Sequence, residues 1–477
     1  TWSQRLSLGR PGLVCFFDAF VFPLLSTMLV RWLMLLCVAL CARSVVSQGT
    51  QQCPASNTIT PCSCTVKKNG LDILCEFTEQ QHIQKAMNTL RSKPMIIFYL
   101  KLRHNNLAKL PSYIFLGLDI RHLTVHNSSL AVIEDSSLSS IGNKLTQLDV
   151  SQNSLATIPT SSFTHLNHLL ILNMNHNKVT AVHNRAFIGL DTLEILTLYE
   201  NRISVVDAEA FKGLRNLDSL GLAHNQLREV PAQVFSHLTF LNSLELEGNQ
   251  IQRIDEKAFA GLEGKNHNST AVTPPSLLDI TIKNLQYLRL GDNRLHDIPS
   301  EALRPLHRLR HLDLRSNNIT YISEDAFTGY GDSITFLNLQ KNMIHQLPTM
   351  GFDNLNSLET LNLQNNKLQH IPEEIMEPIL DTLRVVDIMD NPLICDCELA
   401  WYEAWLSGLR DRDDEMMQKK RTVCTMVNEH REYSVAKMPL EKMSCKRKPP
   451  YGRPSGATKT KPIIATNALL IIAARWL

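Results

Sequence analysis

The sequence lacks the short motifs that mark most enzyme active sites. The metalloprotease H-E-x-x-H pattern, the phosphate-binding loop, the dinucleotide-binding fingerprint and the nucleophile elbow are all missing from its 477 residues. Each of those chemistries needs particular side chains at fixed spacings. We therefore predict that the chain is not an enzyme and that it has no catalytic residue, cofactor or metal site.

A strong excess of charge is also missing. The 48 Lys and Arg residues nearly balance the 46 Asp and Glu residues, which gives a formal net charge of +2. Nucleic acids and anionic membranes attract chains with a large positive excess. The composition therefore predicts no nucleic-acid partner, and contact with a membrane only through an anchor.

Cysteine is absent from the long stretch between Cys75 and Cys395. Three of the 11 cysteines lie near the N-terminus, and the other eight form a cluster of four on each side of the stretch: Cys53, Cys62, Cys64 and Cys75, then Cys395, Cys397, Cys424 and Cys445. Even-numbered clusters in an exported chain indicate disulfide bonds. Zinc binding by the two C-x-C pairs is the alternative.

A repeat fills this cysteine-free stretch. Leu193–Leu214 reads L-x-x-L-x-L-x-x-N-x-I and then a looser half that ends in Phe-x-x-Leu, and the pattern restarts after 24 residues at Leu217. Such a period is the leucine-rich-repeat signature, so we predict an α/β solenoid of horseshoe type, with a parallel concave β-sheet and an irregular convex side. Twelve copies begin at Ile97, Ile120, Leu145, Leu169, Leu193, Leu217, Leu241, Leu285, Leu309, Ile334, Leu358 and Leu383.

The repeated residues have structural reasons to be there. Alternating leucines predict a short strand with one buried face, and the Asn after each strand can satisfy backbone groups where the chain turns away from the sheet. Ser128 replaces this Asn in the second repeat. We predict an Asn ladder and, on the convex side, an aromatic spine of Phe163, Phe187, Phe211, Phe235, Phe259, Phe327 and Phe352.

The N-terminal residues lie outside the repeats. We interpret residues 1–27, which contain no Met, as an untranslated or non-native leader. Residues 28–47 read as a secretory signal peptide, with Arg31 before an apolar run and a small-residue cleavage site before Gln48. An uncleaved membrane anchor is the alternative, although the run is short for spanning a bilayer.

The cysteine clusters resemble the caps of a known family. Cys53-Pro-x7-Cys62-x-Cys64-x10-Cys75 is similar to the N-terminal cap of extracellular leucine-rich-repeat proteins, and Asn391-Pro-Leu-x-Cys395-Asp-Cys397 to their C-terminal cap. That family includes Slit, the Toll receptor ectodomains, matrix proteoglycan cores, chaoptin and connectin, and the chain resembles its arthropod secreted members in layout. The resemblance implies the pairs Cys53–Cys64, Cys62–Cys75, Cys395–Cys424 and Cys397–Cys445.

These observations divide the chain. We predict an N-terminal cap over residues 48–96, repeats over 97–390, and a C-terminal cap over 391–445. One repeat is 44 residues long because of an insertion at 263–283, for which the alternatives are a partner-binding loop, a tolerated extension and a retained intron. The basic, Pro/Gly-rich tail, residues 446–477, ends in a short apolar segment and is either disordered or a signal for a GPI anchor.

The predicted surface offers modification sites and a contact face. Three N-x-S/T sequons predict N-glycans at Asn127, Asn268 and Asn318. Four histidines near the strand ends, His104, His126, His176 and His224, form either a pH-responsive row or ordinary solvated side chains. One residue in the middle of each strand should face the concave side, and this central row is Lys101, Thr124, Asp149, Asn173, Thr197, Gly221, Glu245, Arg289, Asp313, Asn338, Asn362 and Asp387. We expect exposed aromatic rings at Tyr199, Tyr287 and Phe336.

Because Tyr and Arg are enriched in binding hot spots, we select as candidate contacts on the concave face Tyr199, Glu200, Glu245, Glu247, Tyr287, Arg289, Arg310 and Arg315.

The sequence thus predicts a secreted or surface-tethered recognition scaffold that binds an extracellular protein through its concave sheet, in matrix organisation, adhesion or signalling. Innate-immune pattern recognition and a non-catalytic subunit of a secreted enzyme complex are the alternatives. The mixed polar character of the predicted face favours the first, since recognition of microbial glycans or lipids would call for a basic or apolar patch.

Overall fold

The computed structural model describes residues 52–92, 95–262, 285–408 and 421–446, all of which belong to one compact unit. The predicted leader, the signal peptide, the insertion at 263–283 with Asn268, and the tail beyond residue 446 lie outside the described residues. Within the described part of the chain, every helix is too short or too polar to cross a bilayer.

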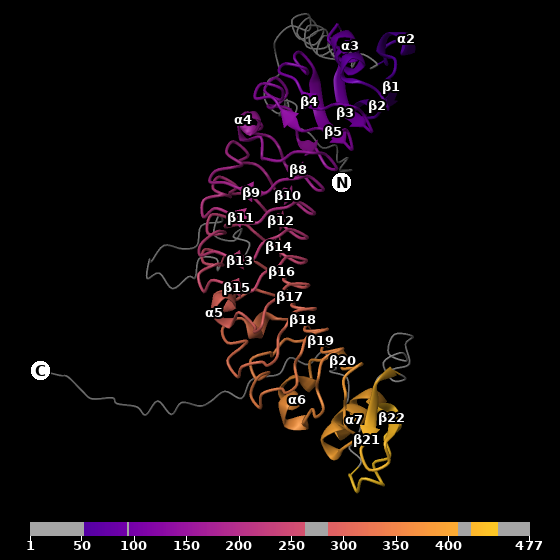
Figure 1. Ribbon diagram of the computed structural model, residues 1–477, viewed down its shortest axis with the longest axis vertical. Coiled ribbons are helices and arrows are strands. Elements are labelled where there is room, and N and C mark those ends of the chain that lie inside the picture. Colours follow the sequence, from indigo (N-terminus) through magenta and orange to yellow (C-terminus); the bar gives the residue numbers. More distant parts are fainter. Residues whose placement is uncertain (1–51, 93–94, 263–284, 409–420, 447–477) are drawn as a thin grey trace, which may run out of the picture. The chain divides into compact units, whose positions relative to one another are not determined.

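A single sheet of 14 strands runs through the unit, and it confirms the predicted solenoid (Figure 1). Strands β1 (Ser63–Lys67) and β2 (Gly70–Glu76) are antiparallel and belong to the N-terminal cap. One parallel strand from each of the twelve repeats follows: β3 (Ile96–Arg103), β5 (Asp119–His126), β7 (Gln147–Asp149), β8 (Ile171–Asn173), β10 (Ile195–Thr197), β12 (Ser219–Gly221), β14 (Ser243–Glu245), β16 (Tyr287–Arg289), β17 (His311–Asp313), β18 (Phe336–Asn338), β19 (Thr360–Asn362) and β20 (Val385–Asp387).

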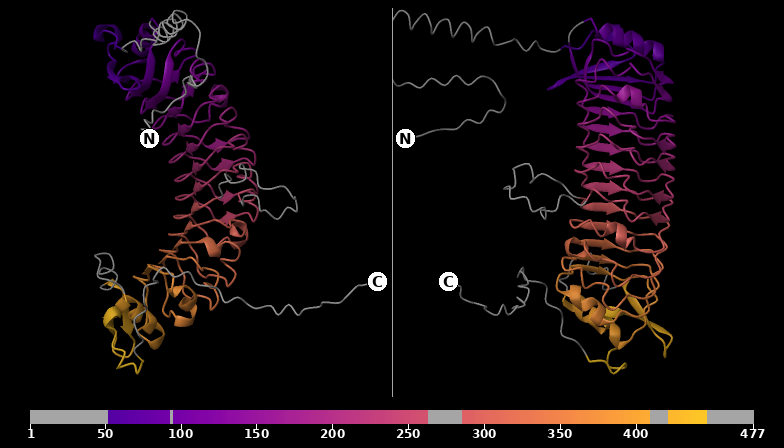
Figure 2. Two further views of the ribbon diagram at one scale, coloured as in Figure 1. Left: turned by 180° about the vertical axis from the view of Figure 1, so that it is seen from behind. Right: turned by 90° about the vertical axis from the view of Figure 1, so that its left-hand side faces the viewer.

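The side opposite the sheet is more regular than the sequence predicted (Figure 2). Short parallel strand pairs and short helices occur there: β4 (Lys109–Leu110) with β6 (Val132–Ile133), β9 (Ala181–Val182) with β11 (Val205–Val206), β13 (Glu229–Val230) with β15 (Arg253–Ile254), α4 (Thr160–Phe163), α5 (Ser300–Leu303), η2 (Gly331–Ser333) and α6 (Glu373–Leu380). The repeats supply β-branched residues at several of these positions, which favours pairing between neighbours.

The Asn ladder is present and explains the period of the sequence. The side-chain amide of Asn225 donates to the carbonyl oxygens of Leu198, Leu222 and Ala223 at 2.9, 3.0 and 3.2 Å. Its Oδ1 accepts from the backbone N–H of Ile203 at 3.0 Å. One side chain therefore satisfies buried backbone groups of two neighbouring repeats.

The predicted aromatic spine is also present. All seven predicted phenylalanines are buried, and Phe115 of the first repeat is buried with them. The rings of Phe187, Phe211, Phe235 and Phe259 stack at centroid distances of 6.1, 6.0 and 6.2 Å. The leucines of the sheet and this spine make one continuous core along the solenoid.

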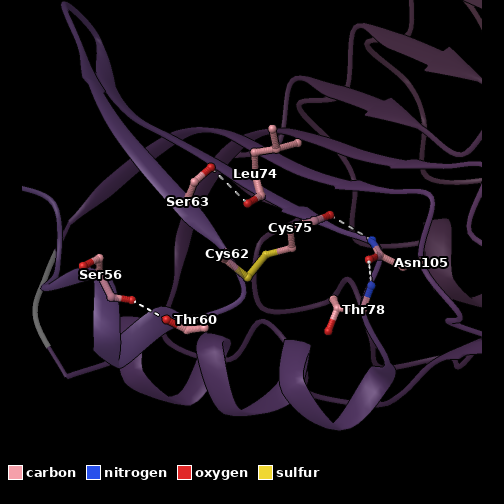
Figure 3. The surroundings of a disulfide bond; sticks show 8 residues. All are labelled: Ser56, Thr60, Cys62, Ser63, Leu74, Cys75, Thr78 and Asn105. Carbon is pink, nitrogen blue, oxygen red and sulfur yellow. Dashed lines mark hydrogen bonds between the residues drawn. A yellow bond between two sulfur atoms is a disulfide. The ribbon is translucent and has the colours of Figure 1, made fainter.

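The N-terminal cap is joined to the ladder. Disulfides link Cys53 to Cys64 and Cys62 to Cys75. The carbonyl of Cys75 accepts from the side-chain amide of Asn105 at 2.9 Å, and the Oδ1 of Asn105 accepts from Thr78 N–H at 3.0 Å (Figure 3). Helices α2 (Ser56–Ile59) and α3 (Gln80–Leu90) complete the cap. The cap therefore covers the edge strand that the first repeat would otherwise expose.

The C-terminal cap closes the other end. Disulfides link Cys395 to Cys424 and Cys397 to Cys445, so all four pairs are those that the family resemblance implies. Trp401 is fully buried, and its indole Nε1–H donates to the carbonyl of Ile371 at 2.8 Å. The cap's elements are η3 (Cys397–Leu399), α7 (Ala400–Gly408), β21 (Val423–Met426), β22 (Arg431–Ser434) and η4 (Val435–Lys437).

The repeats on either side of the insertion pack as direct neighbours. Strands β14 and β16 pair in parallel with Leu244 opposite Leu288. The ladder also continues, because the amide of Asn293 donates to the carbonyl of Leu246 at 3.0 Å. The additional residues therefore leave the register of the sheet unchanged.

The residue before each ladder position has a left-handed backbone. These residues, together with Phe77 at the corresponding place after β2 in the N-terminal cap, form a row along one edge of the sheet that we call the edge row. Their φ angles lie between 45° and 67°. Only glycine adopts this region without steric cost, and β-branched residues are the least tolerant of it. The edge row is Phe77, His104, Asn127, Gln152, His176, Glu200, His224, Gly248, Asp292, Ser316, Lys341, Asn365 and Asp390.

Candidate functional site

The central row of the concave face is partly structural. The sequence placed Asp313 on the contact face, but this side chain is only 3% exposed. Its Oδ1 accepts from the backbone N–H of Arg315, two residues later, at 3.0 Å. The same bond secures the chain after the strand in five other repeats, through Asp149, Asn173, Asn338, Asn362 and Asp387. Six of the twelve residues in the central row therefore use a side-chain oxygen to bind the backbone of their own repeat.

Repeats 5 to 8 hold a chain of contacts that crosses the sheet. The hydroxyl of Tyr199 donates to the carboxylate of Glu245, and the guanidinium of Arg289 lies 3.4 Å from the same carboxylate. Tyr199 reaches Glu245 across Gly221, where a Cβ would lie 2.2 Å from the tyrosine Cε1. Gly221 is therefore required for Tyr199 to lie flat, and Tyr199 is half-buried, whereas the sequence predicted an exposed ring.

A second set of contacts surrounds Arg315. Its guanidinium lies 3.6 Å from Glu247, 3.3 Å from Asp292 and against the buried carboxylate of Asp313.

The two sets of contacts also affect the pKa of Glu245. Partial burial raises the pKa of Glu245, the nearby charge of Glu247 acts in the same direction, and Arg289 opposes both. Opposite charges thus hold one another in place on this part of the sheet.

An aromatic row lies beside these ion pairs. Tyr287 on β16, His311 on β17 and Phe336 on β18 are consecutive partners in the sheet. The rings of His311 and Phe336 stack at 4.0 Å with an interplanar angle of 3°, and Tyr287 lies 6.0 Å from His311. Tyr287 is 43% exposed, while Phe336 is half-buried rather than exposed as predicted. His311 was not among the residues selected from the sequence, although a comparison of the residue before the central leucine in successive repeats would have found it.

We expect the pKa of His311 to lie below the ordinary value of a histidine. Burial lowers the pKa of its imidazole, Arg289 lowers it further and Asp313 raises it. The folded state therefore favours the neutral ring, so this group's contribution to stability is complete above the unfolded pKa and is lost as the pH falls towards the folded value. NMR titration of the imidazole protons should show the pKa of His311 rising towards the ordinary histidine value in Phe336→Ala and unchanged in Tyr321→Ala. An unchanged pKa in Phe336→Ala would contradict the assignment.

The eight candidate contacts fall into two groups. Five of them touch one another in the two networks just described, and Tyr287 shares strand β16 with Arg289. Glu200 lies apart, in the edge row, where its carboxylate is 2.9 Å from His176 Nδ1. Arg310 is exposed and immediately precedes β17. The sequence could not show which charges would pair with one another.

Two other features lie away from these contacts. A hollow of about 450 Å³ opens where β8, β10 and β12 begin, and it is lined by Leu170, Thr192, Glu194, Ile195, Asn216, Asp218 and Phe240. At the C-terminal cap, His370 Nδ1 lies 2.6 Å from Asp396 and 3.8 Å from Glu398. These three groups are close enough to share a metal ion, although an ordinary ion pair accounts for their geometry.

Residues 119–264 and 283–344 match, in overlapping segments, the family model described as Leucine rich repeat, and residues 357–377 match a second model described in the same words. These matches fall on the second to the eleventh repeat and leave the first repeat, the twelfth repeat and both caps uncovered. The repeat motif inferred from the sequence is thus found independently.

Solved structures share this fold at low sequence identity. A chain of the octameric complex of Latrophilin 3, Unc5D and FLRT2, in which FLRT2 is the leucine-rich-repeat component, is 22% identical with a TM-score of 0.57, over 72% of this chain and 95% of that one. The Toll–Spatzle complex of Drosophila gives 20% identity and a TM-score of 0.52, over 73% and 52%. The TLR13–ssRNA13 complex gives 21% and 0.46, over 70% and 56%. This chain therefore spans about half the length of the Toll and TLR13 chains.

Proposed function

Since the chain folds as a leucine-rich-repeat solenoid closed by a disulfide-bonded cap at each end, we propose that it acts outside the cell as a recognition scaffold that binds a protein partner on its concave sheet. The four disulfides support this location, because such bonds persist in oxidising compartments. Two solved solenoids of the same fold, FLRT2 and Toll, form complexes with proteins, which supports a protein partner.

The arrangement of Tyr287 and Arg289 is the observation that carries this proposal. Both side chains are more than two-fifths exposed and leave the same strand, β16. Glu245, the partner of Arg289 on the neighbouring strand β14, holds its guanidinium, and the hydroxyl of Tyr199 in turn binds Glu245. An exposed Tyr and Arg that are fixed before binding lose little side-chain entropy when a partner arrives.

The surroundings of β16 favour a partner with mixed chemistry. His311 and Phe336 extend the apolar surface of Tyr287 across the next two strands, and Arg310 adds an exposed positive charge at the beginning of β17. The acidic groups nearby are more covered, since Glu245 and Glu247 are each 18% exposed. A partner that presents an apolar side chain next to a carboxylate would match this surface.

Within that function, we place the chain among adhesion, matrix or signalling proteins of the Slit, chaoptin and connectin kind. Its two disulfide-bonded caps and the continuous sheet of its repeats support this placement. We further propose that residues 28–47 direct secretion and that the protein is released, or held at the surface by a lipid anchor on its tail.

The test is a pair of substitutions on β16. We expect the double variant Tyr287→Ala, Arg289→Ala of the secreted full chain to lose at least 30-fold in affinity, because each hot-spot residue contributes roughly 1–2 kcal/mol or more. Binding would be measured by surface plasmon resonance against the ligand selected from an array of purified extracellular domains.

A matched control removes one exposed Tyr and one exposed Arg elsewhere. Tyr321→Ala with Arg253→Ala makes the same chemical change away from the concave sheet and should keep wild-type affinity. Equal affinities for the two double variants would show that Tyr287 and Arg289 on β16 do not contact the partner. Retention of the chain inside the cell would contradict an extracellular role.

A further inference from the structure

Phe77 is an aromatic side chain that the fold leaves uncovered. It is 80% exposed, although it belongs to the N-terminal cap, whose other large apolar groups are mostly buried. Its φ of 51° also places a bulky residue in the left-handed region, where such residues are uncommon. Phe77 begins the edge row and is the only aromatic benzene ring in it. An exposed aromatic ring and a strained backbone at the same residue both lower stability, and their occurrence together suggests that the ring has a function outside the core.

His104 connects Phe77 to a sequon. The rings of Phe77 and His104 stack at 5.4 Å with an interplanar angle of 11°. On the next repeat, Nδ2 of Asn127 lies 3.0 Å from Nδ1 of His104. Asn127 is exposed and begins the sequence Asn127-Ser128-Ser129. The atom that N-glycosylation modifies thus touches one end of a two-ring surface.

We propose that Asn127 carries an N-glycan whose first two sugars pack along His104 and Phe77. In this modification a lipid-linked oligosaccharide diphosphate donates the glycan: the bond from sugar C1 to the phosphate oxygen breaks, the Nδ2–C1 bond forms, and the amide releases one of its two protons. The remaining N–H can still donate to His104. The inference rests on the proposed function, because only a chain that enters the secretory pathway meets this donor.

The dimensions of the edge row fit this arrangement. Phe77 and Asn127 are separated by two steps of the sheet, about 10 Å, which is the span of a disaccharide. One face of an N-acetylglucosamine ring carries only C–H groups, and such a face packs well on an aromatic ring. The sugar would cover a ring that otherwise remains in water.

The consequence concerns which part of the concave face is open. A glycan seated on Phe77 and His104 would shield the rim of repeats 1 and 2. The surface on β16 and β17 lies six and seven strands further along the sheet from β5 and would stay accessible. The glycan would therefore direct partners away from the first two repeats and leave the later ones open.

The experiment uses the full chain with Asn268→Gln and Asn318→Gln, so that Asn127 is the remaining sequon, secreted from cells that add uniform N-glycans. Glycopeptide mass spectrometry should find Asn127 occupied. NMR of the N-acetylglucosamine protons should show ring-current shifts that disappear in Phe77→Ala. Glycosidase should then release the glycan several-fold faster, because the aromatic support is lost.

The control is Tyr113→Ala, since Tyr113 is also exposed and also has a left-handed backbone, with φ of 59°. It should leave both the shifts and the release rate unchanged. An unoccupied Asn127, or identical shifts and release rates in Phe77→Ala and the parent, would overturn the inference. Either result would leave binding at β16 standing, whereas loss of secretion or an inert β16 would count against the proposed function itself.

Discussion

Replacing Asn225 with alanine should lower the free energy of unfolding by about 4 kcal/mol. The substitution removes three hydrogen bonds to the carbonyls of Leu198, Leu222 and Ala223 and one from the N–H of Ile203. The N–H of Ile203 then remains buried without a partner, which costs about 1–3 kcal/mol. The three carbonyls each lose one of two donors, at about 0.5–1.5 kcal/mol apiece, and keep bonds from Asn201, Asn249 and the N–H of Glu200. Because the bonds join two repeats, the loss weakens the interface between them.

Urea denaturation followed by circular dichroism would measure the change. Asn216→Ala is the matched control, because its exposed amide donates one bond to the carbonyl of Asp191 and water can replace it. We expect the control to stay within about 0.5 kcal/mol of the parent. Equal losses in the two variants would show that the ladder bonds contribute nothing special to this solenoid.

Trp401→Ala should cost about 3–5 kcal/mol, and the damage should begin at the C-terminal end. Trp401 is fully buried, packs against Tyr402 at 5.3 Å and donates to the carbonyl of Ile371. Its removal leaves a cavity between the cap and the last repeats. Since each repeat contacts only its neighbours, opening at one end spreads inward.

A second substitution separates the loss of packing from the loss of the hydrogen bond to Ile371. Trp401→Phe keeps an aromatic ring but leaves the Ile371 carbonyl without its donor, so about 1–2 kcal/mol is expected. Hydrogen exchange should show faster opening of β20 and β19 in Trp401→Ala, with β5 unchanged. Uniform acceleration along the whole sheet would instead show that the solenoid unfolds as a single unit.

The architecture could be predicted because its residues repeat. The Asn ladder, the phenylalanine spine and the strand in each repeat follow from apolar spacing and from the need to satisfy buried backbone groups. Asn225 and Phe211 could be assigned without a structure, since any chain with this period must place an amide and a large apolar group there. The disulfide pairs came from the resemblance to known caps, because spacing alone leaves connectivity open.

The surface could be predicted only in part. Tyr199, Glu245 and Arg289 were selected as separate contacts, yet they form one chain that depends on Gly221, and nothing in a single repeat reveals such a contact between repeats. Asp313 was placed on the contact face because its position in the repeat faces the concave side, whereas its carboxylate in fact accepts from the backbone two residues later. Side-chain pairing depends on distances between repeats, and these are set by the stacking of the repeats rather than by the pattern within one.

The left-handed edge row has a consequence for how this surface can change. Its residues are chemically diverse, with acids, amides, imidazoles, a lysine, a serine, a glycine and a phenylalanine, but valine, isoleucine and threonine do not occur there. Backbone sterics explain the omission, because a branched Cβ fits this conformation worst. Natural variation or a designed library can therefore alter charge and size along this rim freely, provided that its amino-acid alphabet leaves out those three residues.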